Sequence, residues 1–240
     1  MAHRSFTAKF AKNAKDITKA SHEAEIQLRD STMTSTLAIV VCGPQLEVAF
    51  RGPSGGVASL VRLAGVSPRS TLVLAAADLL IEDAGMEPSA IERVVISRGP
   101  GSFTGIRAGI ATAQGLAAAT GAAIIAFDSL LVQAARCGPV DEVWAAQPGR
   151  RGEVYARPFR VRGRGLPEPL AEIEIAAIST LGDRGPWVAS DSLDLGEGVP
   201  VTPRRTAAEA LLRLAEGQAE PQPVEPLYVE GPPIHGAEIQ

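Results

Sequence analysis

A glycine-rich run at residues 99–105, GPGSFTG, constrains the fold of this chain more than any other feature. It separates a strand pattern at Arg93–Ser97 from a long helical stretch that ends at Thr120. A strand, a glycine turn and a helix can together bind a phosphate, because the first backbone N–H groups of the helix point toward the anion. The glycine spacing, however, differs by one residue from G-x-G-x-x-G, and no Gly-Lys-Ser/Thr follows. The alternative is a structural turn in which Ser102 or Thr104 caps the helix.

The order of patterns along the first half of the chain indicates a mixed α/β sheet. Strand patterns occupy residues 36–41, 46–50 and 57–63, and the turn clusters between them predict an antiparallel meander. A helix, a strand, a helix, a strand and a helix follow, at residues 71–85, 93–97, 104–120, 122–127 and 128–136. Ser70 is the expected N-cap of the first of these helices. The order β-β-β-α-β-α-β-α predicts an α/β fold whose sheet is covered by helices.

We expect the chain to divide into a basic extension and two lobes. Residues 1–35 carry basic residues without an apolar stretch, which predicts a disordered tail or an upstream start with Met33 as the true initiator; the alternative is a targeting presequence. Residues 36–127 form the first lobe, and residues 128–240 form a second, loop-rich lobe. The patterns of the second lobe are two strands and a helix, at residues 142–147, 153–160 and 207–215. Its proline-rich end, residues 218–240, is expected to be extended along the surface or disordered.

The composition excludes several classes of protein. A net charge of -4 gives no field that would attract a phosphate backbone, so RNA binding by this chain alone is not expected. Cys42 and Cys137 are the only cysteines, too few for a disulfide framework or a zinc cage. No apolar run approaches the ~18 residues of a membrane span. We therefore expect a cytoplasmic protein with no contact to a membrane.

Histidine is missing from the part of the sequence that carries the fold patterns. The three histidines are His3, His22 and His235, in the two terminal stretches. General acid–base catalysis and metal binding usually use His together with Cys, Asp and Glu from several elements. Acidic residues such as Glu82 and Asp141 stand in surface-like charged contexts. The sequence predicts no catalytic residue, no metal site and no cofactor of the chain's own.

Two helical stretches have surfaces that are typical of close packing. Small residues recur every fourth position of the stretch 104–120 and form a nearly smooth stripe. They are Gly105, Gly109, Ala113 and Ala117. The stretch 71–85 is apolar almost all round, as in helices that are buried on more than one face. The sheet covers one face, and a partner subunit would cover another. The alternative is that both faces are buried within the chain.

Three segments of the chain resemble the TsaB family, whose members are paralogues of the TsaD carbamoyl transferase. The first and most specific is SRGPGSFTGIR at residues 97–107, which continues into ATAQGLA at 111–117. The second, RRGEVY at 150–155, is similar to the family's Ala-Arg-x-Gly-Glu-Val-Tyr strand. The third, EPLYV at 225–229, resembles the Pro-x-Tyr-Leu-Arg close of the family's chains. The resemblance implies an actin-like, ribonuclease-H-like fold with two lobes, of which the second is trimmed.

Membership of this family implies a non-catalytic scaffold or dimerisation subunit. Such a subunit binds TsaD and, with the ATPase TsaE, supports transfer of a threonylcarbamoyl group to the adenosine next to the anticodon of tRNA. ATP and metal would be used by the partner subunits, tRNA would be contacted only through the complex, and a homodimer is a further state to consider. The alternatives are a nucleotide-binding or glycoprotease-like enzyme and a stand-alone homodimer without a role on tRNA.

The resemblance also implies a partner interface on the helices that flank the glycine loop. The expected interface residues are Leu72, Ala76, Leu79, Leu80, Phe103, Thr104, Ile106, Arg107, Gly109, Ile110 and Ala113. The expected residues of the structural loop are Gly99, Pro100, Gly101 and Gly105. In this interpretation the loop sets the turn that starts the helix and has no chemistry of its own.

The chain departs from the family pattern at its first strand. The family usually continues Leu-Ala-Ile with Asp-Thr-Ser, whereas here LAI at residues 37–39 is followed by VVCG at residues 40–43. The acid and the hydroxyl groups of an ancestral phosphate loop are therefore missing, which argues against autonomous ATP binding. The expected interface residues are unaffected by these departures, which agrees with the expectation of a scaffold.

Overall fold

The computed structural model describes residues 33–55, 58–65, 69–150, 152–163, 165–190, 193, 199–217 and 224–230. The predictions for residues 1–32 lie outside these ranges, as do the three histidines. The prediction of a disordered tail does not hold for residues 33–35, because they make hydrogen bonds to the folded part of the chain. The Met33 N–H donates to the Pro53 carbonyl at 2.9 Å, and the buried Ser35 donates its N–H to the Glu92 carboxylate at 2.8 Å.

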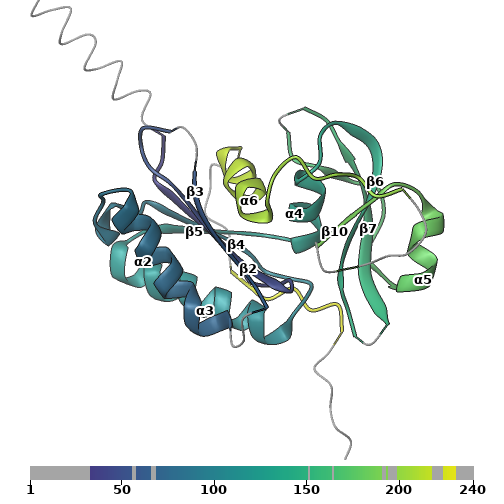
Figure 1. The fold of residues 1–240 in the computed structure, drawn as a ribbon, viewed down its shortest axis with the longest axis horizontal. Helices are drawn as coiled ribbons and strands as arrows, with labels where there is room; N and C mark the ends of the chain where they lie inside the picture. Colours follow the sequence, from purple (N-terminus) through teal and green to yellow (C-terminus); the bar gives the residue numbers. More distant parts are fainter. Residues whose placement is uncertain are drawn as a thin grey trace, which may run out of the picture.

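A five-stranded mixed sheet forms the centre of the first lobe (Figure 1). Its strands are β1 (Thr36–Val40), β2 (Gln45–Arg51), β3 (Ser59–Ala64), β4 (Arg93–Ser97) and β5 (Ala123–Phe127), in the order β3-β2-β1-β4-β5. β1, β2 and β3 form the predicted antiparallel meander, and β4 and β5 extend the sheet from β1 in parallel. The central strand β1 is buried along its whole length, because its side chains alternate between two covered faces.

Helices cover both faces of this sheet (Figure 1). On one face lie α2 (Val73–Asp83) and α3 (Phe103–Thr120), in a hydrophobic core with every second residue of β1. On the other face lie α4 (Ser129–Ala135) and α6 (Ala207–Glu216), packed against the remaining residues of β1. Because successive side chains of a strand point to opposite faces, β1 contributes residues to both hydrophobic cores of the lobe.

Ser70 is not the N-cap of α2. It lies in a 3-10 turn, η1 (Arg69–Leu72), and Leu72 occupies the cap position without a side-chain hydrogen bond. The α-helix therefore begins at Val73 rather than at the predicted residue 71. At α4 the cap is a side chain, since the Asp128 carboxylate accepts the Leu130 N–H at 2.7 Å.

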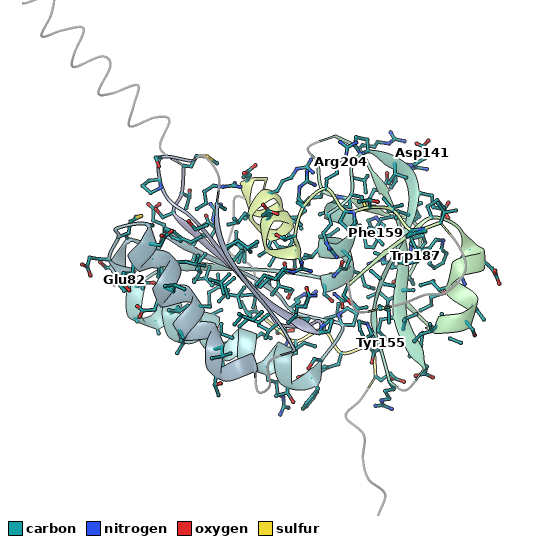
Figure 2. The ribbon with its side chains drawn as sticks, viewed as in Figure 1. Glu82, Asp141, Tyr155, Phe159, Trp187 and Arg204 are labelled. Atoms are coloured by element: carbon teal, nitrogen blue, oxygen red, sulfur yellow. The ribbon has the colours of Figure 1, made fainter. Side chains whose placement is uncertain are left out.

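A second five-stranded sheet forms the other lobe. Its strands are β6 (Val140–Pro148), β7 (Glu153–Val161), β8 (Glu168–Pro169), β9 (Glu174–Ala177) and β10 (Trp187–Ala189). β6 and β7 form a long antiparallel hairpin that carries Phe159 (Figure 2), whereas β8, β9 and β10 have two, four and three residues. The short helices α5 (Ile178–Leu181), η2 (Pro88–Ala90) and η3 (Gly182–Arg184) complete the described elements. The short outer strands agree with the prediction of a trimmed second lobe.

Helix α6 does not follow the predicted division of the chain at residue 127. It comes after the second sheet in the sequence, yet it packs on the first sheet, whose second face it shares with α4. Thr206 and Glu209 form a capping box at its start, and the buried Glu47 of β2 accepts the Ala208 N–H at 2.9 Å. An amphipathic helix must bury its apolar stripe, and the uncovered face of the first sheet is where α6 does so.

This strand order, with helices on both faces and a second sheet beside them, is the actin-like, ribonuclease-H-like fold that the sequence predicts. Among the described residues, no helix combines the length and the apolar character that crossing a membrane requires.

Candidate functional site

The glycine loop after β4 is a tight strand-to-helix turn. Gly99 and Gly101 have φ angles of 112° and 146°, which L side chains rarely adopt. Ser102 is the N-cap of α3, because its hydroxyl accepts the Gly105 N–H at 3.2 Å. Thr104, the other cap that the sequence allowed, lies inside the helix. The loop has the geometry of the structural turn that the sequence predicts.

The space beside the loop glycines is filled by backbone carbonyl groups of the chain itself. A Cβ added at Gly99 would collide with the Leu227 carbonyl oxygen, and one at Gly101 with the Cys42 carbonyl oxygen. These oxygens carry partial negative charge, as does the Gly99 carbonyl oxygen, which accepts a hydrogen bond from the Ser129 N–H at 2.7 Å. An anion would be repelled by such neighbours. The glycines therefore permit close packing of the loop against the backbone of its own chain.

Residues 224–230, which we call the C-terminal strap, connect the glycine loop to the second lobe. At one end the Leu227 N–H donates to the Arg98 carbonyl at 2.8 Å. At the other end the Glu230 carboxylate lies 3.1 Å from Arg150 Nε and accepts a hydrogen bond from the Tyr155 hydroxyl at 3.3 Å. This stretch confirms, for residues 224–230, the prediction of a chain end extended along the surface.

A cavity of about 410 Å³ lies between the two lobes, beside the glycine loop and the strap. Its walls are turns of both sheets, the start of α3 and the strap: Cys42, Gly43, Pro44, Pro100, Gly101, Ser102, Phe103, Pro148, Gly149, Arg150, Tyr155, Leu227, Tyr228, Val229 and Glu230. Each of the three segments that carry the family resemblance contributes to this wall. Tyr155, labelled in Figure 2, is the contribution of β7. The sequence did not predict that these distant segments meet.

The chemistry of this cavity offers no activated nucleophile among the described residues. Burial raises the pKa of the Cys42 thiol to about 11, so the thiol stays protonated at neutral pH. Burial, followed by the negative charge of Glu230, raises the pKa of Tyr155. Burial also raises the pKa of Asp128, although its carboxylate is already engaged in capping α4. Within the described ranges, no group of three or more His, Cys, Asp or Glu side chains could hold a metal ion.

Both cysteines are expected to be unreactive toward a thiol reagent such as DTNB while the protein is folded. Cys42 and Cys137 are free and buried, and burial raises the pKa of each thiol to about 11. The thiolate is the reactive form, and little of it exists at pH 8. Titration should detect no thiol in the native protein and two per chain in denaturant. Fast reaction of a native thiol would contradict this account of a closed cavity wall at Cys42.

The structure divides the predicted interface residues into two groups. Six of them are buried in the first lobe and unavailable to a partner while the chain is folded: Ala76, Leu80, Ile106, Gly109, Ile110 and Ala113. Leu72 is half-buried. Four are exposed and remain in the interface prediction: Leu79, Phe103, Thr104 and Arg107.

The small-residue stripe of α3 faces its own chain rather than a partner. A Cβ added at Gly105 would collide with the Val41 carbonyl oxygen, and one at Gly109 would lie 3.3 Å from Val41 Cγ2. Ala113 on the same stripe is fully buried. The close approach that small residues permit is therefore between α3 and the end of β1. This corrects the expectation that the stripe contacts another protein.

The outer side of α2 exposes large aliphatic side chains that the first lobe does not cover. Leu74 and Leu79 are 56% and 57% exposed. Glu82, farther along the helix, points away from the body of the protein (Figure 2). Leu74 was absent from the predicted interface, because an all-round apolar pattern does not tell which side of a helix faces the sheet.

Comparison with known proteins agrees with the fold and the motifs. The family model of TsaD, tRNA N6-adenosine threonylcarbamoyltransferase, matches residues 65–184, half of the chain. Two relatives carry the name "tRNA threonylcarbamoyladenosine biosynthesis protein TsaB". That of Bacillus subtilis is 34% identical over 90 residues, 36% of this chain and 38% of the relative. That of Escherichia coli is 38% identical over 79 residues, 32% of this chain and 34% of the relative.

The matched part spans little more than a third of the length of these relatives. The solved structure of YeaZ from Pseudomonas aeruginosa superposes on 82% of this chain and 100% of its own, with a TM-score of 0.67 and 22% sequence identity. That superposition shows a shared fold. The TsaD family model, which matches half of the chain, and the relatives named TsaB together show that the chain belongs to the TsaB family.

Proposed function

We propose that this chain is a non-catalytic scaffold subunit in the synthesis of threonylcarbamoyladenosine in tRNA. In this proposal it binds a TsaD-like transferase and, within the complex, a TsaE-like ATPase. The observation that carries the proposal is the uncovered apolar surface of α2, where Leu74 and Leu79 are each more than half exposed. The name of the curated relatives supports the pathway, and the match to the TsaD family model relates this chain to the transferase that we propose as its partner.

The contact surface that we propose is the partner face. It consists of the outward residues of α2 and of the first turns of α3: Leu74, Leu79, Phe103, Thr104 and Arg107. Burying a leucine side chain contributes about 1.5–3 kcal/mol, so covering both leucines would supply a useful part of an association energy. Aromatic and arginine side chains, such as Phe103 and Arg107, are enriched at the centres of interfaces.

We also propose that the subunit uses no nucleotide or metal of its own. Support comes from the glycine loop, whose glycines pack against carbonyl oxygens of Cys42 and Leu227. A phosphate site instead needs N–H groups pointing at the anion. The protonated thiol of Cys42 supports the absence of a metal, because the thiolate is the form that binds metal ions.

Co-expression with the TsaD protein of the same cells tests the proposal. We expect the two chains to co-elute as a stoichiometric complex, and the complex, supplied with TsaE, ATP and a threonylcarbamoyl donor, to modify tRNA. Omission of this chain should abolish or strongly reduce the modification. If the chain stays apart from TsaD under these conditions, the scaffold proposal fails and a stand-alone homodimer takes its place.

Calorimetric titration of the isolated chain with ATP separates the scaffold from the enzyme alternative. We expect no binding heat at micromolar concentrations. Micromolar binding accompanied by ATP turnover would replace the scaffold proposal with a nucleotide-binding enzyme, whatever the outcome of the co-expression.

A further inference from the structure

Three side chains from separate segments form an exposed group at the start of α3, which we call the arginine–aromatic cluster. The rings of Phe103 and Tyr228 stack with their centroids 5.2 Å apart and an interplanar angle of 29°. Arg107 Cζ lies 4.2 Å from the centroid of the Phe103 ring, and Arg107 Nε donates to the Tyr228 hydroxyl at 3.2 Å. Phe103 and Tyr228 are each 37% exposed, and Arg107 is exposed as well.

The cluster holds the guanidinium group of Arg107 in a defined plane. One ring stacks against it and one hydroxyl occupies its Nε–H. Across the described part of the chain, the Tyr228 hydroxyl is the polar partner of this side chain, and the two terminal nitrogens have none. Those two nitrogens present paired N–H donors whose spacing matches a carboxylate. Because the side chain is already ordered, binding an anion there costs less conformational entropy than at a free arginine.

The surroundings of the cluster favour a single carboxylate over a polyanion. The exposed carboxylates of Asp78 and Glu82 lie on α2, the other helix of the partner face. Arg150, on the far wall of the cavity, is paired with Glu230 at 3.1 Å. The net charge of -4 for the chain gives no global field that would attract a nucleic acid backbone.

We propose that the arginine–aromatic cluster binds an aspartate or glutamate side chain of the partner protein. The inference rests on the proposed function, since it requires a partner that covers α2 and α3. It adds Tyr228, a residue of the C-terminal strap, to the partner face. The strap thereby links the cavity between the lobes to the surface that recognises the partner.

Affinity for purified TsaD, measured by calorimetry at low and high salt, tests the cluster. Arg107→Ala should weaken binding about 30-fold at low salt, in the range of a charge-assisted hydrogen bond pair at an interface. Arg107→Lys should lose nearly as much, because an ammonium group has no planar fork and stacks poorly. Tyr228→Phe keeps the ring stack and removes one hydrogen bond, so a loss of about 3-fold is expected. The loss in Arg107→Ala should shrink as salt is raised.

Arg162→Ala is the matched control, because Arg162 is an exposed arginine of the second lobe, away from α2 and α3. It should bind TsaD as the wild type does. Thermal unfolding distinguishes a role of the cluster in binding the partner from a role that only holds the C-terminal strap in place. The unfolding midpoints of Arg107→Lys and Tyr228→Phe should stay within about 2 °C of the wild type, as expected for exposed positions. A larger fall in both midpoints, in proportion to the lost affinity, would overturn the proposal.

Other outcomes are equally decisive. If the wild type binds TsaD and Arg107→Lys binds it as tightly, the carboxylate inference is wrong and the proposed function stands. If the wild type does not bind TsaD, both are wrong. If the affinity for TsaD is unchanged in Arg107→Ala while the assembled complex loses affinity for tRNA, the anion is a phosphate and the inference is again overturned.

Discussion

Gly105→Ala is expected to destabilise the protein by about 3 kcal/mol, the upper part of the range for overpacking a rigid site. The added methyl group would collide with the Val41 carbonyl oxygen and would meet Ser102 Cβ at 3.3 Å. Both neighbours are held in place, since Ser102 caps α3 and Val41 continues the buried strand β1. Relief would require α3 to move off the sheet along its first turn. Thermal or denaturant unfolding would show a fall in midpoint of roughly 10 °C for a domain of this size.

Gly115→Ala provides the matched control in the same helix. Gly115 is exposed, and a Cβ added there meets nothing within 4 Å. Since glycine is about 1 kcal/mol less favourable than alanine inside a helix, this substitution should raise the midpoint by a few degrees. The same glycine-to-alanine change in one helix is thus expected to lower the unfolding midpoint at residue 105 and to raise it at residue 115. Equal shifts in the two variants would contradict the packing that we describe between α3 and β1.

Leu79→Glu is expected to weaken association with TsaD strongly while leaving the isolated chain folded. The side chain is 57% exposed, so the glutamate stays hydrated in the monomer and stability should change by no more than about 0.5 kcal/mol. In a complex the same carboxylate would be buried without a partner, which raises the dissociation constant by about two orders of magnitude. Unfolding curves and calorimetry on the same preparation measure both effects.

Ala113→Glu, unlike Leu79→Glu, should unfold the isolated chain. Ala113 is 0% exposed within the first lobe, so the carboxylate would be buried in the monomer itself and the chain should lose its fold. From the sequence alone, Ala113 and Leu79 were equivalent members of one interface. Leu166→Glu, at a leucine that is 50% exposed on the second lobe, is the control and should change neither stability nor association. Loss of association in Leu166→Glu equal to that in Leu79→Glu would contradict the location of the partner face.

Local chemistry explains why much of the first lobe could be predicted. Alternating and continuous apolar runs placed β1, β2 and β4 within a residue or two, and the serine ahead of α3 proved to be its cap. The prediction was wrong at Ser70, because a 3-10 turn precedes α2 and Leu72, not Ser70, occupies the N-cap position. Such a turn depends on how the chain packs over the sheet, and a cap residue alone does not encode it.

At the glycine loop, too, the sequence predicted the turn but not the groups that surround it. The spacing of its glycines, together with Val40, Val41 and Cys42 where the family has an acid and two hydroxyl residues, predicted a turn without phosphate chemistry. The identity of the group beside each glycine could not be predicted, because the Leu227 carbonyl comes from a residue more than a hundred positions away. The helix period gave the stripe of Gly105, Gly109 and Ala113, but a period does not tell whether a smooth stripe meets a strand of the same chain or a partner.

The sequence by itself determined the order of elements in the first lobe, the position of the turn at the glycine loop, two candidate caps of α3 and the family resemblance. These depend on short-range preferences and on motifs that are read within a few residues. Only the tertiary structure decided which face of each helix is buried, that α6 returns to the first sheet, and that the C-terminal strap brings Tyr228 to Phe103 and Arg107. Burial is a property of the whole packed chain, because each apolar face is covered by whichever element reaches it, at any distance in sequence.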